Sequence, residues 1–94
     1  MLPHQRCLLE EYPFLVDHPV DEAVLDHVKK WLTPDERDKI DVILERGAKT
    51  RKFLDIMILK HDKDSFDSFI KGLRANNSTH IVCRLEERMR QIGS

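Results

Sequence analysis

Apolar residues recur at intervals of three and four positions along most of this 94-residue chain, which is the spacing of amphipathic α-helices. The most apolar stretch runs from Phe53 to Arg74. Its first third is apolar almost all round, as expected of a helix enclosed by other helices, and its last third is apolar on one face. We expect this helix pair to hold the core. Its most buried members should be Leu54, Met57, Ile58, Phe66, Phe69 and Leu73.

The same pattern divides the chain into six helical segments. They fall near residues 3–16, 21–31, 34–46, 49–60, 65–74 and from 79 onward. Pro13 interrupts the first segment, and a kink is expected there because proline removes a helical hydrogen bond and clashes with the preceding turn. Short amphipathic helices joined by tight turns predict an all-α, antiparallel six-helix bundle. Residues 1–94 suffice for a single domain, which we expect to be part of a longer chain.

Several residues mark the expected helix ends. Asp21 is a typical N-cap, and Thr33-Pro34-Asp35-Glu36 combines a cap residue, a proline at the first helical position and a Glu three residues after the cap. Gly47 is expected just beyond the end of the third helix. The core face of that helix would consist of Ile40, Ile43 and Leu44. Asn76-Asn77 predicts a turn that uses the left-handed region, after which Ser78 would cap the last helix.

The charges nearly balance, with 16 basic and 17 acidic residues and a net charge of −1. Because nucleic-acid binding usually requires a basic excess, this balance argues against nucleic acid as the main partner. No apolar run approaches the length of a membrane span, and the charged N-terminus is unlike a signal peptide. Cys7 and Cys83 are too few for a disulfide framework, so we expect two small core residues in the reducing cytoplasm.

No pattern of catalytic or ligand-binding residues stands out. The three glycines are isolated, which excludes a glycine-rich phosphate loop, and the five histidines show no metal-binding spacing. The carboxylate pairs Glu10-Glu11 and Glu86-Glu87 are expected to be solvated, since catalytic groups must converge in a pocket. We therefore expect a protein that is not an enzyme and that holds no cofactor and no metal ion.

A helix-turn-helix DNA reader is a weaker alternative. The last helix offers Arg84, Arg88 and Gln91, which are residue types of a recognition helix, but Glu86 and Glu87 lie among them. Salt-sensitive binding in a gel-shift assay would support this alternative.

Charge segregation along the chain is the remaining signal. Acidic residues on the second and third helices are Glu22, Asp26, Asp38, Asp41 and Glu45. Basic residues gather around the start of the fourth helix at Arg46, Lys49, Arg51 and Lys52. Positive charge in a first helical turn costs about 0.3–1 kcal/mol, so this cluster could serve a partner outside the helix. Both charge runs could equally be ordinary solvated surface.

The order of these motifs resembles a caspase-recruitment domain of the death-fold superfamily, over nearly the whole chain. The kinked first helix, the acidic entry to the third helix and the basic start of the fourth are similar to features of that family. The matching stretches are Arg6-Cys7-Leu8-Leu9, Val24-Leu25-Asp26-His27, Leu32-Thr33-Pro34-Asp35-Glu36, Lys49-Thr50-Arg51-Lys52-Phe53-Leu54-Asp55-Ile56, Asp64-Ser65-Phe66-Asp67-Ser68-Phe69, Leu73-Arg74 and Ile81-Val82-Cys83-Arg84-Leu85.

The resemblance implies a six-helix Greek-key death fold and a role as a protein–protein interaction module. In the family, an acidic face of one domain binds a basic face of another. By position, the acidic face here is Asp26, Asp35, Asp38 and Asp41, and the basic face is Arg6, Lys49, Arg51 and Lys52. The sequence departs from the family where Lys29, Lys30 and Arg37 interrupt the acidic face, and where Glu10, Glu11 and Tyr12 dilute the basic face.

The implied partner is another caspase-recruitment domain, carried by a caspase, an adaptor or a receptor, or a second copy of this chain. Neither nucleic acid nor a membrane is expected as a partner. The implied setting is the assembly of an apoptotic or innate-immune signalling complex in the cytoplasm.

A structural scaffold domain is the main alternative to this function. Leu85, Met89 and Ile92 have near-heptad spacing, and charged residues surround them. The last helix could therefore lead into a C-terminal coiled coil.

Overall fold

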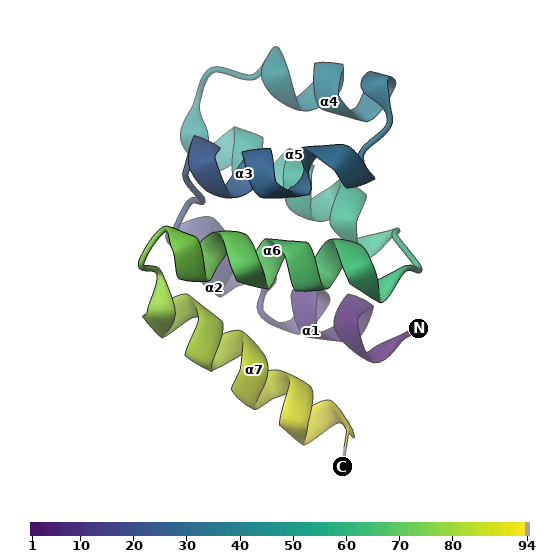
Figure 1. The fold of residues 1–94 in the computed structure, drawn as a ribbon, viewed down its shortest axis with the longest axis vertical. Helices are drawn as coiled ribbons and strands as arrows, with labels where there is room; N and C mark the ends of the chain where they lie inside the picture. The colour runs from purple at the N-terminus through teal and green to yellow at the C-terminus, as the bar shows by residue number, and fades with distance from the viewer. Residues whose placement is uncertain (94) are drawn as a thin grey trace.

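The structure is a computed structural model that describes residues 1–93, and within that range it contains helices and no strand (Figure 1). The elements are α1 (Pro3–Glu10), α2 (Tyr12–Asp17), α3 (Glu22–Val28), a 3-10 turn (Lys29–Trp31), α4 (Pro34–Asp41), α5 (Arg46–Ile58), α6 (Lys63–Ala75) and α7 (Thr79–Gly93). The predicted all-α class is therefore confirmed.

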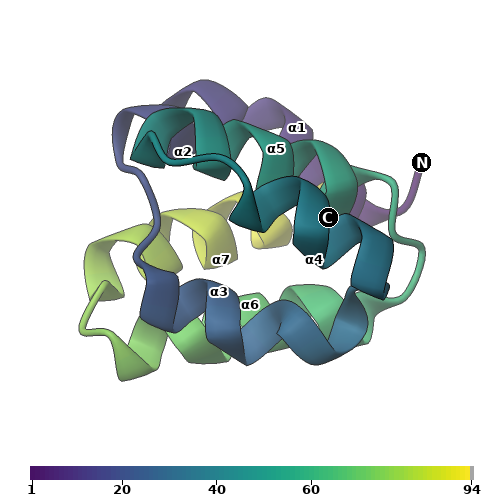
Figure 2. The same ribbon diagram turned by 90° about the horizontal axis from the view of Figure 1, so that it is seen from above.

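The helices form two layers, which are clearest when the molecule is viewed from above (Figure 2). One layer contains α1, α2 and α5, and the other contains α3 and α6, which pack along each other. The last helix, α7, packs against α1 and α6, while α4 lies at the far end of the molecule and packs chiefly on α5. The core fills the space between the layers.

The first predicted segment is broken into α1 and α2 at Glu11, immediately before the Tyr12-Pro13 start of α2. Glu11 has φ −95° and ψ 7°, outside the helical range, so the chain changes direction there. Pro13 then lies in the first turn of α2, where its missing N–H removes no helical hydrogen bond. The predicted kink near Pro13 is confirmed.

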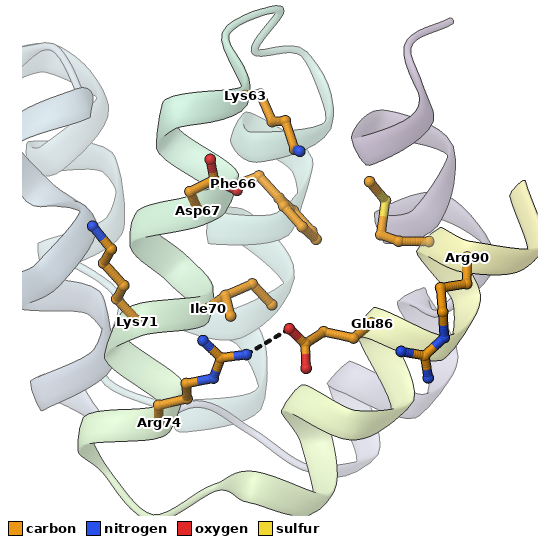
Figure 3. A pocket seen from close by; sticks show the side chains of 9 residues that line it. Lys63, Phe66, Asp67, Ile70, Lys71, Arg74, Glu86 and Arg90 are labelled. Carbon is orange, nitrogen blue, oxygen red and sulfur yellow. Dashed lines mark hydrogen bonds and ion pairs between the residues drawn. The ribbon is translucent and has the colours of Figure 1, made fainter. Parts of the chain in front are cut away.

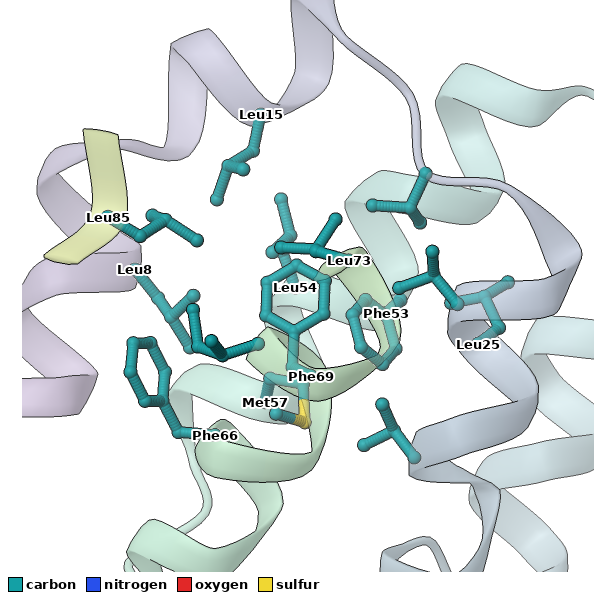
Figure 4. Close-up of a cluster of buried hydrophobic side chains, with 14 of the residues drawn as sticks. Leu8, Leu15, Leu25, Phe53, Leu54, Met57, Phe66, Phe69, Leu73 and Leu85 are labelled. Atoms are coloured by element: carbon teal, nitrogen blue, oxygen red, sulfur yellow. The ribbon is translucent and has the colours of Figure 1, made fainter. Parts of the chain in front are cut away.

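The core is made of side chains from helices that are distant in the sequence (Figure 4). The rings of Phe53 on α5 and Phe69 on α6 meet edge to face, with centroids 5.3 Å apart, and both are fully buried. Leu8, Leu15 and Leu85 close the core on the side of α1, α2 and α7. Of the predicted core residues in the central helix pair, only Ile58 is not buried, because it lies at the surface beside α1.

Gly72 permits the close packing of α3 on α6. A Cβ atom at position 72 would lie 3.1 Å from Cβ of His27 and 3.2 Å from the carbonyl oxygen of Val24. Only a residue without a side chain fits this crossing without a shift, although glycine in a helix interior is intrinsically unfavourable.

The prediction for the end of the third helix was wrong. α4 ends at Asp41, so of its predicted core face only Ile40 is buried, Ile43 is half-buried and Leu44 is 96% exposed. Gly47 is not beyond the end of α4 but in the first turn of α5. The carboxylate of Glu45 accepts hydrogen bonds from the N–H groups of Gly47 and Ala48, and this cap starts α5 one turn earlier than expected.

Two further predictions have mixed outcomes. Cys7 is buried as expected, but Cys83 is exposed on α7, so the prediction of two core cysteines was wrong for Cys83. Burial raises the pKa of the Cys7 thiol to about 12.

At the turn before α7, Asn77 has φ 59°, which confirms the left-handed residue predicted there.

Truncation of Phe69 should remove a large part of the stability of the fold. We expect Phe69→Ala to lower the free energy of unfolding by about 3–5 kcal/mol, because it leaves a cavity against Phe53. The matched control is Leu44→Ala, which should change it by less than about 0.5 kcal/mol, because Leu44 is exposed. Urea denaturation followed by circular dichroism measures both. Equal losses for the two variants would contradict the described core.

Candidate protein-binding surfaces

The predicted basic residues on α5 are not equally available. The ammonium group of Lys49 pairs with Glu22 of α3, and its side chain is only 15% exposed. Arg51 is exposed and Lys52 is half-buried, and neither forms an ion pair with any residue in the range 1–93. The free positive charge on α5 is therefore carried by two of the three predicted residues.

Arg6 lies at the other end of the basic face. The side-chain amide of Gln5 donates to the carbonyl oxygen of Ile58 at 2.9 Å, and the hydroxyl of Tyr12 donates to Asp55 at 3.1 Å. The α1–α2 segment therefore runs antiparallel to α5, and Arg6 lies beside the C-terminal half of α5. Seven helical residues separate Ile58 from Arg51, which corresponds to about 10 Å along the axis. Arg6 is also paired with Glu10 at 2.6 Å.

A surface groove lies between these two ends of the basic face. It has a volume of about 530 Å³ and is lined by Leu9, Tyr12 and Pro13 from α1 and α2, and by Asp55 and Ile58 from α5. The pKa of the Tyr12 hydroxyl is raised, mainly by burial and to a smaller extent by the hydrogen bond to Asp55. The nearby Arg51 opposes this shift.

Sequence reasoning did not identify this groove. It assigned Ile58 to the core, and it placed Tyr12 on the apolar face of the first segment, where this residue would also dilute the basic face. The available signal was the position of Leu9 and Pro13, which are apolar but lie outside the main buried face of the first segment.

On the acidic side, the structure brings Asp26 of α3 and Asp41 of α4 together around one cation. The Nζ atom of Lys29 lies 3.1 Å from Asp26 and 3.9 Å from Asp41. The hydrogen bond to Asp26 raises the pKa of the Lys29 ammonium group. Asp35 lies 3.9 Å from Lys39, whereas Asp38 forms no ion pair with a described residue. Lys29 thus links two carboxylates of the acidic face and reduces the net negative charge of that face.

Directly after these carboxylates, the α4–α5 loop exposes apolar side chains. Val42 is 74% exposed and Leu44 is 96% exposed, and Ile43 between them is half-buried. Exposed apolar side chains next to one another can mark an interaction surface. The loop was missed because the apolar spacing of residues 40–44 continues the helical pattern past the real end of α4.

A second groove lies between α6 and α7 (Figure 3). Its volume is about 430 Å³, and its rim carries charges of both signs, including Arg74, which pairs with Glu86 at 2.5 Å. Phe66 and Ile70 at its base are buried, so they offer little apolar surface to a ligand. This mixed rim provides no set of converging catalytic groups.

Glu11 is a buried carboxylate, and the prediction that the Glu10-Glu11 pair would be solvated was wrong for it. Only 2% of its side chain is exposed, and its two oxygens accept from Nε of Arg84 at 2.5 Å and Nε of Arg88 at 2.8 Å. Burial raises the pKa of this carboxyl, but the hydrogen bonds from Arg84 and Arg88 outweigh burial and leave the pKa below its usual value. The guanidinium of Arg84 also covers the ring of Phe14 at 4.1 Å.

The contacts of α7 weaken the two alternative functions. Arg84 and Arg88, which a DNA reader would need on its recognition helix, are both bound to Glu11. On the same helix, Leu85 is buried, and Met89 and Ile92 pack against the core of the domain. The apolar stripe that suggested a coiled coil is therefore largely used by this domain, with Leu85 buried and Met89 and Ile92 partly buried.

Residues 1–93 contain no group of three His, Cys, Asp or Glu side chains placed to bind a metal ion. In the same range, no helix combines the length and apolar character needed to cross a membrane. Comparison with models of known protein families gave no match, and comparison with curated protein sequences gave none either.

Loss of the Glu11 charge should destabilise the fold. We expect Glu11→Gln to lower the free energy of unfolding by about 1–3 kcal/mol, because a buried group loses charge-assisted hydrogen bonds from two guanidinium groups. Glu87→Gln is the matched control on the exposed surface of α7, where the carboxylate bonds Arg90, and its effect should be clearly smaller. Chemical denaturation at neutral pH measures both, and an equal effect would contradict the role given to Glu11.

Glu11 should also contribute to the pH dependence of stability. Because its pKa is lower in the folded chain than the ordinary value of 4.5, its contribution is complete above about pH 4.5 and is lost as the pH falls through the folded pKa. Denaturation midpoints at a series of pH values should therefore fall less steeply for Glu11→Gln than for the wild type in acid. Parallel curves would contradict this assignment.

Proposed function

We propose that this chain is a caspase-recruitment domain with a Greek-key death fold. It acts in the cytoplasm as a non-enzymatic adaptor module that binds another domain of the same fold. The binding contributes to the assembly of an apoptotic or innate-immune signalling complex. The kinked first helical segment and the order of the helices support this proposal, together with the motifs that resemble the family.

One observation carries the proposal. Within residues 1–93, no ion pair joins the acidic face (Asp26, Asp35, Asp38 and Asp41) to the basic face (Arg6, Lys49, Arg51 and Lys52). The two faces are complementary in charge, yet they do not neutralise each other inside the molecule. Arg51 and Lys52 on the basic face and Asp38 on the acidic face form no ion pair with a described residue, so these three charges are available to a second domain.

The physical role of the charges is to set the rate and specificity of association. Complementary charged surfaces steer encounter and reject partners of like charge, and added salt weakens them. Arg51 and Lys52 are well suited to this role because the next two residues of α5, Phe53 and Leu54, are fully buried and fix the position of the helix.

Charge reversal at Arg51 and Lys52 tests the proposed basic face. We expect Arg51→Glu/Lys52→Glu to weaken binding to a caspase-recruitment domain, or to a second copy of the chain, by about 100-fold or more, because like charges would then face each other. Biolayer interferometry against a panel of purified caspase-recruitment domains, combined with light scattering of the chain alone, measures this at low and high salt.

Lys63→Glu/Lys71→Glu is the matched control, since it reverses two exposed lysines on α6. It should leave binding unchanged. Unaltered binding by the Arg51→Glu/Lys52→Glu variant with the fold intact would remove the basic face from the proposal. If the wild type binds no member of the panel and does not associate with itself, the proposed function is wrong.

A further inference from the structure

We propose that one copy of this chain binds the next by seating Leu44 in the groove lined by Leu9, Tyr12, Pro13, Asp55 and Ile58. This contact rests on the function proposed above, because it adds a specific apolar anchor to the same basic face. The occupant is a second copy of this chain, and the contact would be made in addition to the pairing of charges.

The anchor is presented by a short loop whose two ends are fixed. At the start, the N–H of Val42 donates to the carbonyl oxygen of Asp38 and the N–H of Ile43 donates to that of Ile40, each at 3.1 Å. At the end, the Glu45 side chain caps α5. Leu44 projects from between these fixed points into solvent, and its own copy leaves it almost entirely uncovered.

The groove has the size and chemistry to accept such a side chain. Small-molecule pockets of a few hundred cubic ångströms are lined mainly by apolar and aromatic groups, and this groove of about 530 Å³ has that character. Leu9 is 50% exposed on one wall. The bond between the Tyr12 hydroxyl and Asp55 fixes the aromatic wall, and tyrosine is a frequent anchor in protein interfaces.

The charges around the two surfaces are complementary. Asp41 directly precedes the loop, and Asp38 lies one turn earlier on α4. At the groove, Arg51 lies one turn before Asp55 on α5, close enough to Tyr12 to affect its pKa. Arg6 is paired with Glu10, whereas Arg51 has no ion pair with a described residue. Asp55 keeps its negative charge although it accepts from the Tyr12 hydroxyl, so an acidic partner group is expected at Arg51 and not at Asp55. A carboxylate beside Leu44 would meet that cation.

The contact uses two different surfaces of the same chain. Since Leu44 is almost fully exposed, it cannot occupy the groove of its own copy. In a head-to-tail arrangement the contact is heterologous, so each bound copy still offers a free loop or a free groove to another. We therefore expect the size of the assembly to increase with protein concentration, and we do not expect a closed dimer.

A complementation experiment tests this contact. Leu44→Glu destroys the anchor and keeps the groove, whereas Leu9→Glu spoils the groove and keeps the anchor, and both residues are exposed so the fold should survive. Size exclusion with light scattering measures the molar mass in solution. We expect the molar mass of the wild type to increase with concentration and each variant alone to stay monomeric. An equimolar mixture of the two variants should form a 1:1 dimer that grows no further. Ala75→Glu, an exposed change on α6, should behave like the wild type.

Each other result overturns the contact. It is wrong if the wild type stays monomeric across the concentration series, if either variant associates like the wild type, or if the mixture remains monomeric. The proposed function is separated from it by Leu44→Ala, which removes the anchor without adding charge. If Leu44→Ala associates like the wild type while Arg51→Glu/Lys52→Glu does not, the charged face stands and the Leu44 contact is wrong.

Discussion

The packing of Phe53 on Phe69 is the contact on which the rest of the molecule depends. It joins α5 to α6, and therefore joins the two layers. Residues before Phe53 on α5 carry the free cations of the basic face, and residues after it line the groove beside α1. Both surfaces are thus held by one helix whose inner side is fully enclosed. A binding surface keeps its geometry only when its supporting shell is packed, and α5 meets that condition.

The Glu11 cluster stabilises the point where the first helical segment breaks before Pro13. The break at Glu11 divides the first segment into two short helices, α1 and α2. The buried carboxylate binds two arginines one turn apart on α7, so the break is held against a continuous helix. A buried charge is tolerated here because both of its oxygens are satisfied, which is the usual requirement for ionised groups away from water.

Periodicity and end signals predicted the helical class, the kink and most of the core. Prediction failed where local and tertiary effects compete. Residues 40–44 keep a helical apolar pattern although the chain leaves the helix after Asp41, and the Glu45 cap begins α5 before the glycine that resembled a terminator. The groove and the Glu11 cluster could not be found from spacing, because each joins residues from distant parts of the chain. Charge type predicted a basic cluster at Lys49, Arg51 and Lys52, but only the structure revealed that Lys49 is already paired with Glu22.

The position of α4 has a consequence for dynamics. This helix is held to the domain mainly by Ile40 and by the ion pair of Glu36 with Lys60 at 2.7 Å, and it contacts chiefly α5. An element with so few attachments opens locally at a lower free energy than the core does, as amide exchange commonly reveals. Three of the four carboxylates of the acidic face, Asp35, Asp38 and Asp41, therefore lie on a lightly attached element. Under the proposed function, the affinity of that face can be tuned through the stability of α4, by substitutions at Ile40 or Lys60 that touch none of its charges.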